Sequence, residues 1–280
     1  MKPEGFLPLQ AKRVLPVDLR AALVVAHPGH ELRIFGWLEK VRPQVFILTD
    51  VSGHTTQGRL AGTAQILDQV GAPRGDIFGR LRDRELYSAL LDGHLDVFLQ
   101  LAAELADALA RSGVDHVVSD AVEGYNPGHD VCSLLAQTAV GLIRRREQRH
   151  IEHFDFLLVG SPVDCPLDLR SQALWLELDE DALDRKLAAA ATIPELAREV
   201  DAALRRSGRD AFRVECLRPA QPLVELTRFS QEPPFYETYG AQQVQAGHYA
   251  RALRFQEHFA PLLEALKTFE SGAVSGSKAA

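Results

Sequence analysis

Two short segments of the sequence place histidines next to proline, glycine and a carboxylate. Residues 26–31 read Ala-His-Pro-Gly-His-Glu, and residues 126–130 read Asn-Pro-Gly-His-Asp. Imidazole is the commonest metal ligand in proteins, and a catalytic zinc site usually combines three protein ligands with a water molecule. His27, His30 and His129 offer such a set of three. The sequence therefore predicts a divalent metal site, with Zn²⁺ as the expected ion, that is open on its solvent side.

Each of these segments follows a stretch that is typical of a buried strand. Residues 24–27 end an apolar run without polar alternation, as expected for a strand covered on both faces of a parallel sheet. Residues 115–120 are expected to form another strand, and the polar loop 123–130 comes directly after it. In an open α/β sheet, ligands bind at the rim formed by the carboxyl ends of the strands. We therefore expect the two histidine segments to meet at that rim.

Strand-like and helix-like stretches alternate through the first 165 residues, which is the pattern of βαβ units. We expect strands at residues 24–27, 44–50, 115–120 and 154–160, and helices at residues 31–41, 59–70, 95–112 and 131–146. The predicted fold class is α/β, Rossmann-like, with a mostly parallel sheet and helices on both faces. Residues 1–165 form its metal-binding core, and residues 166–280 form a helical and irregular C-terminal extension packed on that core.

Residues 166–280 contain fewer sequence patterns from which helices and strands can be predicted. Residues 179–206 are rich in alanine and predict helix, which Pro194 must kink or divide. Residues 214–226 favour one or two strands around Pro219 and Pro222, and residues 249–267 favour an amphipathic helix. We therefore expect this extension to pack on the core as an appendage.

The composition is that of an ordinary globular protein. Together with the net charge, it argues against nucleic-acid and membrane partners. The chain has 280 residues and a formal net charge of -7, which argues against a broad nucleic-acid surface. No apolar run reaches the roughly 18 residues that indicate a membrane span. Three well-separated cysteines suggest neither a disulfide framework nor a thiolate zinc site. We expect a cytoplasmic protein that acts on a small molecule, and the sequence leaves homo-oligomer formation open.

At the level of motifs, Ala26-His27-Pro28-Gly29-His30-Glu31 resembles the Ala-His-Pro-Asp-Asp-Glu signature of the PIG-L (LmbE-like) de-N-acetylases. These are zinc-dependent enzymes that remove acetyl groups from N-acetylglucosamine-type sugars and related amides. In that family a glycine-rich segment with a tyrosine ends in His-Pro-Asp-His, whose last histidine is the third metal ligand. Residues 124–129 are similar to it, and the resemblance extends over roughly residues 20–165. It implies an LmbE-like fold and a metal-dependent hydrolase that removes an N-acyl group from a sugar-like or amine substrate.

The chain also departs from this family at the metal site. In the family, the first aspartate of the signature is the general base and the second is a zinc ligand; here Gly29 and His30 stand in their places. Gly128 and Asn126 likewise replace an aspartate and a histidine of the second motif. General base catalysis typically contributes about 10²–10⁴-fold, so another carboxylate must act if hydrolysis is retained. The candidates for that base are Glu31, Asp130, Asp50 and Asp120.

The remaining assignments follow from the same resemblance. Glu31 and Asp130 are predicted to be catalytic, although the family implies a structural role for Glu31 at a helix start and Asp130 is also suited to orient an imidazole. Tyr125 is a third catalytic candidate, because it corresponds approximately to a tyrosine that polarises the substrate carbonyl; loop packing is its alternative. The predicted substrate-binding residues are Arg59, Asp50 and Asn126. Several aromatic residues either line a sugar site or pack in the interior: Phe235, Tyr236, Tyr239, Tyr249 and Phe255.

Two alternatives to a hydrolase remain open at this point. One is a member of the same fold that binds a metal or ligand but has lost hydrolysis together with the general base. The other is an α/β protein that binds a nucleotide or phosphosugar without a metal. No GxGxxG or P-loop pattern supports the second alternative.

Overall fold

The computed structural model describes residues 19–51, 58–161, 164–221, 226, 229 and 231–272. In this part of the chain, seven strands form a sheet in the order β3-β2-β1-β4-β5-β7-β6. Their bounds are β1 (Ala21–Val25), β2 (Gln44–Thr49), β3 (Arg74–Leu81), β4 (His116–Asp120), β5 (Glu152–Phe156), β6 (Leu174–Glu177) and β7 (Val214–Pro219). β1 to β5 pair in parallel, whereas β7 is antiparallel to both β5 and β6. The predicted α/β class with a mostly parallel sheet is confirmed.

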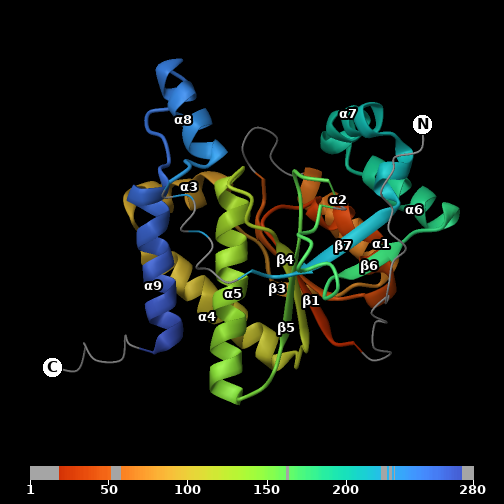
Figure 1. Ribbon diagram of the computed structural model, residues 1–280, viewed down its shortest axis with the longest axis horizontal. Coiled ribbons are helices and arrows are strands. Elements are labelled where there is room, and N and C mark those ends of the chain that lie inside the picture. The colour runs from red at the N-terminus through yellow and green to blue at the C-terminus, as the bar shows by residue number, and fades with distance from the viewer. Residues whose placement is uncertain are drawn as a thin grey trace.

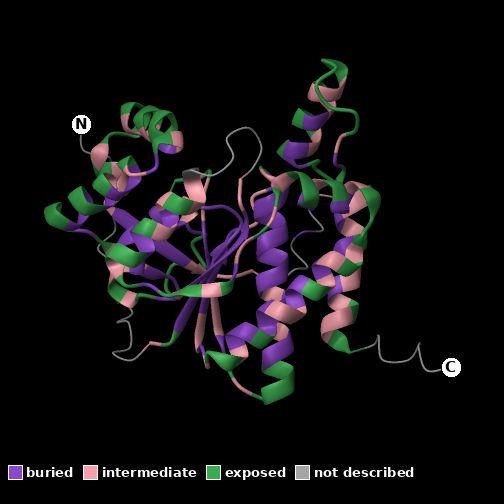
Figure 2. Cartoon of the chain, turned by 180° about the vertical axis from the view of Figure 1, so that it is seen from behind, coloured by how far each residue is buried: buried purple, intermediate pink, exposed green. Residues whose placement is uncertain are grey.

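Helices cover both faces of this sheet (Figure 1). One face packs against α3 (Asp83–Asp92), α4 (Leu95–Arg111), α5 (Pro127–Glu147) and α9 (Ala260–Ser271). The other face packs against α1 (Phe35–Val41), α2 (Gly58–Val70) and α6 (Glu180–Ala191). Figure 2 shows the buried strands between these layers, with exposed residues on the outer sides of the helices and along most of α7 (Ala197–Ser207), whereas α8 (Phe235–Gln245) is mixed. Among the described residues, no helix combines the length and apolarity needed to cross a membrane.

The prediction that residues 123–130 form a loop is wrong at its end. α5 begins at Pro127, because Asn126 caps the helix by accepting a hydrogen bond from the Gly128 N–H at 2.7 Å. Proline at the first helical position loses no hydrogen bond and has a backbone angle suited to the helix. His129 and Asp130 therefore lie in the first turn of a rigid helix.

Other predicted boundaries also need correction, among them that of the helix predicted at residues 31–41, which is a 3-10 turn at His30–Ile34 followed by α1. The strand predicted at residues 154–160 ends at Phe156, because the Glu123 carboxylate accepts hydrogen bonds from the backbone N–H groups of residues 158–160 and holds them in a turn. The helix predicted at residues 249–267 is replaced at its start by an irregular segment and a π-helical turn at Phe255–Phe259, and α9 begins only at Ala260.

The C-terminal region follows its main prediction. The helical stretch divides at Pro194, where a short 3-10 turn, Pro194–Leu196, separates α6 from α7. β7 occupies the first half of the predicted strand region, and together with β6 it extends the sheet formed by the preceding residues. The division of the chain at residue 165 stays a prediction.

His153, on a strand inside the sheet, is expected to make the stability of the fold depend on pH. His153 on β5 lies beside β4, with Nε2 2.9 Å from Ser119 Oγ, and burial lowers the pKa of His153 from 6.5 to about 3. Between these values the unfolded chain binds a proton that the folded chain does not, so the free energy of unfolding falls as pH decreases, by about 1.4 kcal/mol per pH unit. His153→Gln is expected to make this fall shallower in urea unfolding between pH 6.5 and 4.

The matched control for this prediction is His150→Gln, which changes an exposed histidine three residues away. All measurements include a chelator, so that metal binding does not contribute to stability. Equal pH slopes for the wild-type protein and His153→Gln would show that His153 is not a source of the acid sensitivity.

Candidate metal centre

The strand order brings the predicted metal ligands to one place. β1 lies between β2 and β4, so the rim between β1 and β4 is the switch point at which α/β proteins bind ligands. His27 and His30 follow β1, and His129 lies in the first turn of α5 after β4. The ring centroids of His27 and His30 are 5.1 Å apart, and His129 lies 5.2 Å from the first and 4.6 Å from the second. One ligand atom from each residue lies within 4.8 Å of the other two.

Hydrogen bonds fix the orientation of the first two imidazoles. His27 Nδ1 lies 2.7 Å from Thr49 Oγ1, whose own proton is donated to the Ala26 carbonyl at 3.1 Å. The Thr49 hydroxyl therefore accepts from His27 Nδ1–H, and the lone pair of His27 is on Nε2. His30 Nδ1 lies 2.9 Å from Asp120 Oδ2, which likewise leaves the His30 lone pair on Nε2. Both rings are thus held in the tautomer that presents Nε2 to a metal.

His129 supplies an independent test of whether a metal fits. Its Nδ1 is buried and has no hydrogen-bond partner among the described residues. Buried polar atoms are nearly always satisfied, so an orphaned nitrogen beside two other imidazoles calls for an explanation. A divalent cation among the three rings would provide one.

Burial also keeps the three imidazoles neutral. Desolvation, reinforced by His30, lowers the pKa of His27 to about 4. Desolvation and the charge of Arg59 lower the pKa of His30 to about 3, and desolvation followed by repulsion from His30 lowers the pKa of His129 to about 2. Metal ligation requires unprotonated imidazole, so the donor set fits a divalent ion at neutral pH.

Two carboxylates lie next to the histidines of this cluster. Asp120, at the end of β4, is fully buried, and its Oδ2 accepts from the Ala26 N–H at 2.8 Å as well as facing His30. Desolvation raises the pKa of Asp120 to about 6. The second carboxylate is Asp83, whose Oδ1 lies 3.4 Å from His27 Nδ1. Asp83 was not among the predicted site residues because α3 was not predicted from the sequence. The signal available was the pair of acids, Asp83 and Glu85, in the first turn of that helix.

The two carboxylates predicted to be catalytic both hold backbone in place. Glu31 is fully buried; its Oε2 accepts from the Gly29 N–H at 2.8 Å and its Oε1 from the Thr63 hydroxyl at 2.7 Å. Burial raises the pKa of Glu31. Asp130 Oδ1 accepts from the backbone N–H groups of Glu123 and Gly124, at 3.1 and 3.2 Å. These contacts fix the shapes of the two ligand-bearing segments, and catalytic roles for these residues stay predictions.

Asn126 and Arg59, which were predicted to bind substrate, both contact other side chains. The Asn126 side chain caps α5, accepts from the Tyr87 hydroxyl at 3.4 Å, and opposes the fall in the pKa of His27. Arg59 forms an ion pair with Glu199 at 3.1 Å.

Tyr125 is exposed and does not pack in the interior. Its side chain is 45% exposed, and its ring stacks on Phe235 with centroids 4.8 Å apart. Phe235 in turn stacks on Tyr239, whereas Tyr236 and Phe255 are buried in the core. Asp50 follows β2, and its backbone N–H donates to the carbonyl of Leu81, the last residue of β3. Roles in substrate binding for Arg59, Asp50 and Asn126 stay predictions.

Gly29 and Gly128, at the positions where the sequence resemblance implies carboxylates, lie in crowded surroundings. Gly29 has a φ of +102°, and a Cβ built there would lie 2.6 Å from Leu196 Cδ1. A Cβ at Gly128 would lie 3.1 Å from His27 Nε2. The space that a side chain at residue 29 would need is therefore taken by a residue of the C-terminal region.

Comparison with known proteins gives matches at the level of structure. No protein-family profile matches the sequence, and a search of curated proteins found no match. Among solved structures, the conserved protein TT1542 from Thermus thermophilus matches with a TM-score of 0.51 and 21% identity, over 73% of this chain and 95% of that protein.

Two further solved structures are less similar. The A40926 pseudoaglycone deacetylase Dbv21 matches with a TM-score of 0.48 and 16% identity, over 72% of this chain and 97% of that one. The zinc-inhibited form of the teicoplanin deacetylase Orf2 matches with a TM-score of 0.47 and 11% identity, over 71% and 97%. The match to TT1542 extends over nearly all of that protein's length, and this chain has the LmbE-like α/β fold that its motifs predict.

Proposed function

We propose that this chain is a metal-dependent hydrolase that removes an N-acyl group from a small sugar-like or amine substrate. The observation that carries the proposal is the convergence of His27, His30 and His129, with ligand atoms within 4.8 Å, at the switch point of the sheet. The motif resemblance supplies the reaction class. Zn²⁺ is the ion that a neutral three-histidine set suits best.

The three histidines would hold the metal, and the residues behind them would keep the site in shape. When bound, a divalent metal activates water and polarises an amide carbonyl. Thr49 and Asp120 fix the tautomers of His27 and His30. Hydrolysis adds water across the C–N bond, so the acyl group leaves as a carboxylic acid and the amine nitrogen gains a proton. Of the four carboxylates considered as the base, Asp120 is in hydrogen-bond contact with a ligand, which supports a positioning role for it.

One observation favours a second candidate function, a metal- or ligand-binding protein without hydrolysis. Gly29 leaves the family's base position without a carboxylate, and Leu196 occupies the adjoining space. The second motif likewise has Gly128 against His27 in place of an acid. A site that lacks both acids would bind a metal while turning over slowly.

The metal content of the purified protein tests both candidates. We expect about one equivalent of zinc or another divalent ion by elemental analysis. His30→Ala is expected to weaken metal binding by more than about 100-fold, since loss of an outer partner alone costs about 10–100-fold. His150→Ala, at an exposed position, is the control.

Acetate release from N-acetylglucosamine then separates the two candidates. Release that a chelator abolishes supports the hydrolase. Bound metal without such release favours the binding protein. A folded wild-type protein that takes up no metal contradicts the hydrolase and the metal-binding form of the second candidate.

A further inference from the structure

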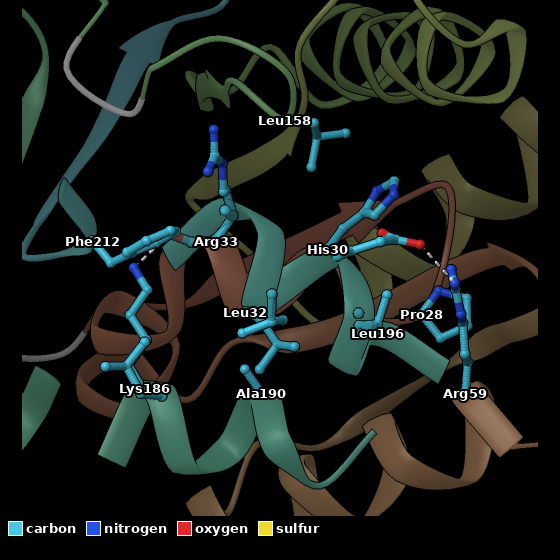
Figure 3. A pocket seen from close by; sticks show the side chains of 15 residues that line it. Pro28, His30, Leu32, Arg33, Arg59, Leu158, Lys186, Ala190, Leu196 and Phe212 are labelled. Atoms are coloured by element: carbon cyan, nitrogen blue, oxygen red, sulfur yellow. Dashed lines mark hydrogen bonds and ion pairs between the residues drawn. The ribbon is translucent and has the colours of Figure 1, made fainter. Parts of the chain in front are cut away.

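A pocket opens directly beside the candidate metal centre (Figure 3). Its volume is about 240 Å³, and at one end it begins at Pro28, Gly29 and His30. Most of its remaining wall is apolar: Leu32, Leu158, Leu196, Val200, Ala203 and Phe212. The metal-binding segment therefore forms one end of an apolar pocket whose far wall comes from α6, α7 and the segment after α7.

The charged side chains in the wall already have partners. Lys186 donates to the Glu215 carboxylate at 2.8 Å and to the Arg33 carbonyl at 2.9 Å. The Arg33 guanidinium donates to two backbone carbonyls of the segment after β5. Arg59 pairs with Glu199 at 3.1 Å. With these charges satisfied, the pocket favours an apolar ligand over an anion.

The volume limits the size of that ligand. A cavity of about 150 Å³ lined by aliphatic and aromatic side chains binds benzene, which has six carbons. In proportion, about 240 Å³ has room for roughly six to ten carbons. An acetyl group places a single methyl group there and would leave most of the apolar wall uncovered.

We infer that this pocket binds the acyl chain of the substrate, and that the preferred substrate is an N-acyl amine with a straight chain of about six to ten carbons. This inference rests on the proposed function, because it places the amide at the metal centre and the chain in the pocket. The acyl carbon lies at the His30 end, and the chain runs between Leu196 and Leu158 toward Phe212.

Binding of simple amides tests the pocket without relying on turnover. Straight-chain primary amides from acetamide to octanamide are titrated by calorimetry into the full-length protein, with and without zinc. Burial of each methylene is expected to raise affinity about fourfold, in both metal states. An affinity that does not change with chain length overturns the inference.

A pair of variants on α7 sharpens this test. Ala203 lines the pocket, and Ala202, the preceding residue of the same helix, is exposed. Ala203→Phe is expected to fill the pocket and reduce octanamide affinity by at least tenfold, whereas Ala202→Phe leaves it unchanged. Equal effects of the two substitutions contradict the assignment. If Ala203→Phe does not fold, as judged by circular dichroism, the chain-length series of the wild-type protein decides.

Amine release from N-acetyl- and N-octanoylglucosamine separates this inference from the proposed function. Chain-dependent amide binding without chelator-sensitive amine release retains the pocket assignment and overturns the hydrolase. Release that is no faster from the octanoyl than from the acetyl substrate retains the hydrolase and overturns the acyl pocket.

Discussion

Replacing Gly29 with aspartate is expected to lower the free energy of unfolding by about 2–5 kcal/mol and not to increase acetate release. The substitution introduces a carboxylate at the position where the signature that residues 26–31 resemble has its general base. Two features oppose it. The φ of +102° at Gly29 strains any residue with a Cβ, and that Cβ would lie 2.6 Å from the buried Leu196 side chain. Urea unfolding at neutral pH in the presence of chelator measures the loss.

Two controls separate backbone strain from steric overlap. Gly93 also has a positive φ, of +69°, but a Cβ there meets nothing within 4 Å, so Gly93→Asp reports strain alone. In a double-mutant cycle, Leu196→Ala should relieve part of the loss caused by Gly29→Asp. Additive losses in that cycle would show that Leu196 does not exclude a side chain from residue 29.

Replacing Lys186 with methionine is expected to cost about 3–5 kcal/mol, because it leaves a buried carboxylate without its cation. Lys186 and Glu215 are both almost completely buried, and their charged atoms are 2.8 Å apart. Glu215 also accepts from the backbone N–H groups of Gly36 and Trp37, at 2.8 and 2.9 Å, so it joins β7 to the start of α1. Chemical denaturation measures the loss of stability.

The preceding residue supplies the matched control. Arg185 on the same helix forms an ion pair with Glu39 at 2.7 Å, but this pair is at the surface. Exposed ion pairs contribute little, so Arg185→Met should leave the unfolding midpoint nearly unchanged. In Lys186→Met, the further substitution Glu215→Gln should restore part of the loss. Similar midpoints for Lys186→Met and Arg185→Met would contradict the assigned importance of the buried pair.

The parts of the fold that sequence could predict are those with strong apolar patterns. β2 is a central, mostly apolar strand, β4 is central with Val117 and Val118 buried at its middle, and α4 has a long apolar face, so each was placed within about one residue of its bounds. β3 is an edge strand with arginines near both ends and few buried residues, which gives no alternating pattern. β6 has only four residues, too few for a period to be recognised. α8 buries little of its surface and so lacks an apolar stripe.

The candidate site was predicted as far as residue identity allows. That the three histidines come together could be predicted because each follows a recognisable strand, and the rim of a parallel sheet gathers such positions. Their role as metal ligands stays a prediction. The partners Thr49 and Asp83 depend on side-chain geometry across different strands and helices. Leu196 beside Gly29 depends on packing between segments more than 160 residues apart, for which sequence spacing carries no signal.

The ligands and most of the pocket wall come from separate stretches of the chain. The imidazoles belong to residues 27–129, whereas much of the wall belongs to residues 186–212. Substitutions in the second stretch are expected to change which molecules fit the pocket, while the three histidines stay the same. If the pocket binds substrate as we propose, substitutions in α6 and α7 are therefore expected to change substrate selectivity while leaving the three-histidine cluster intact.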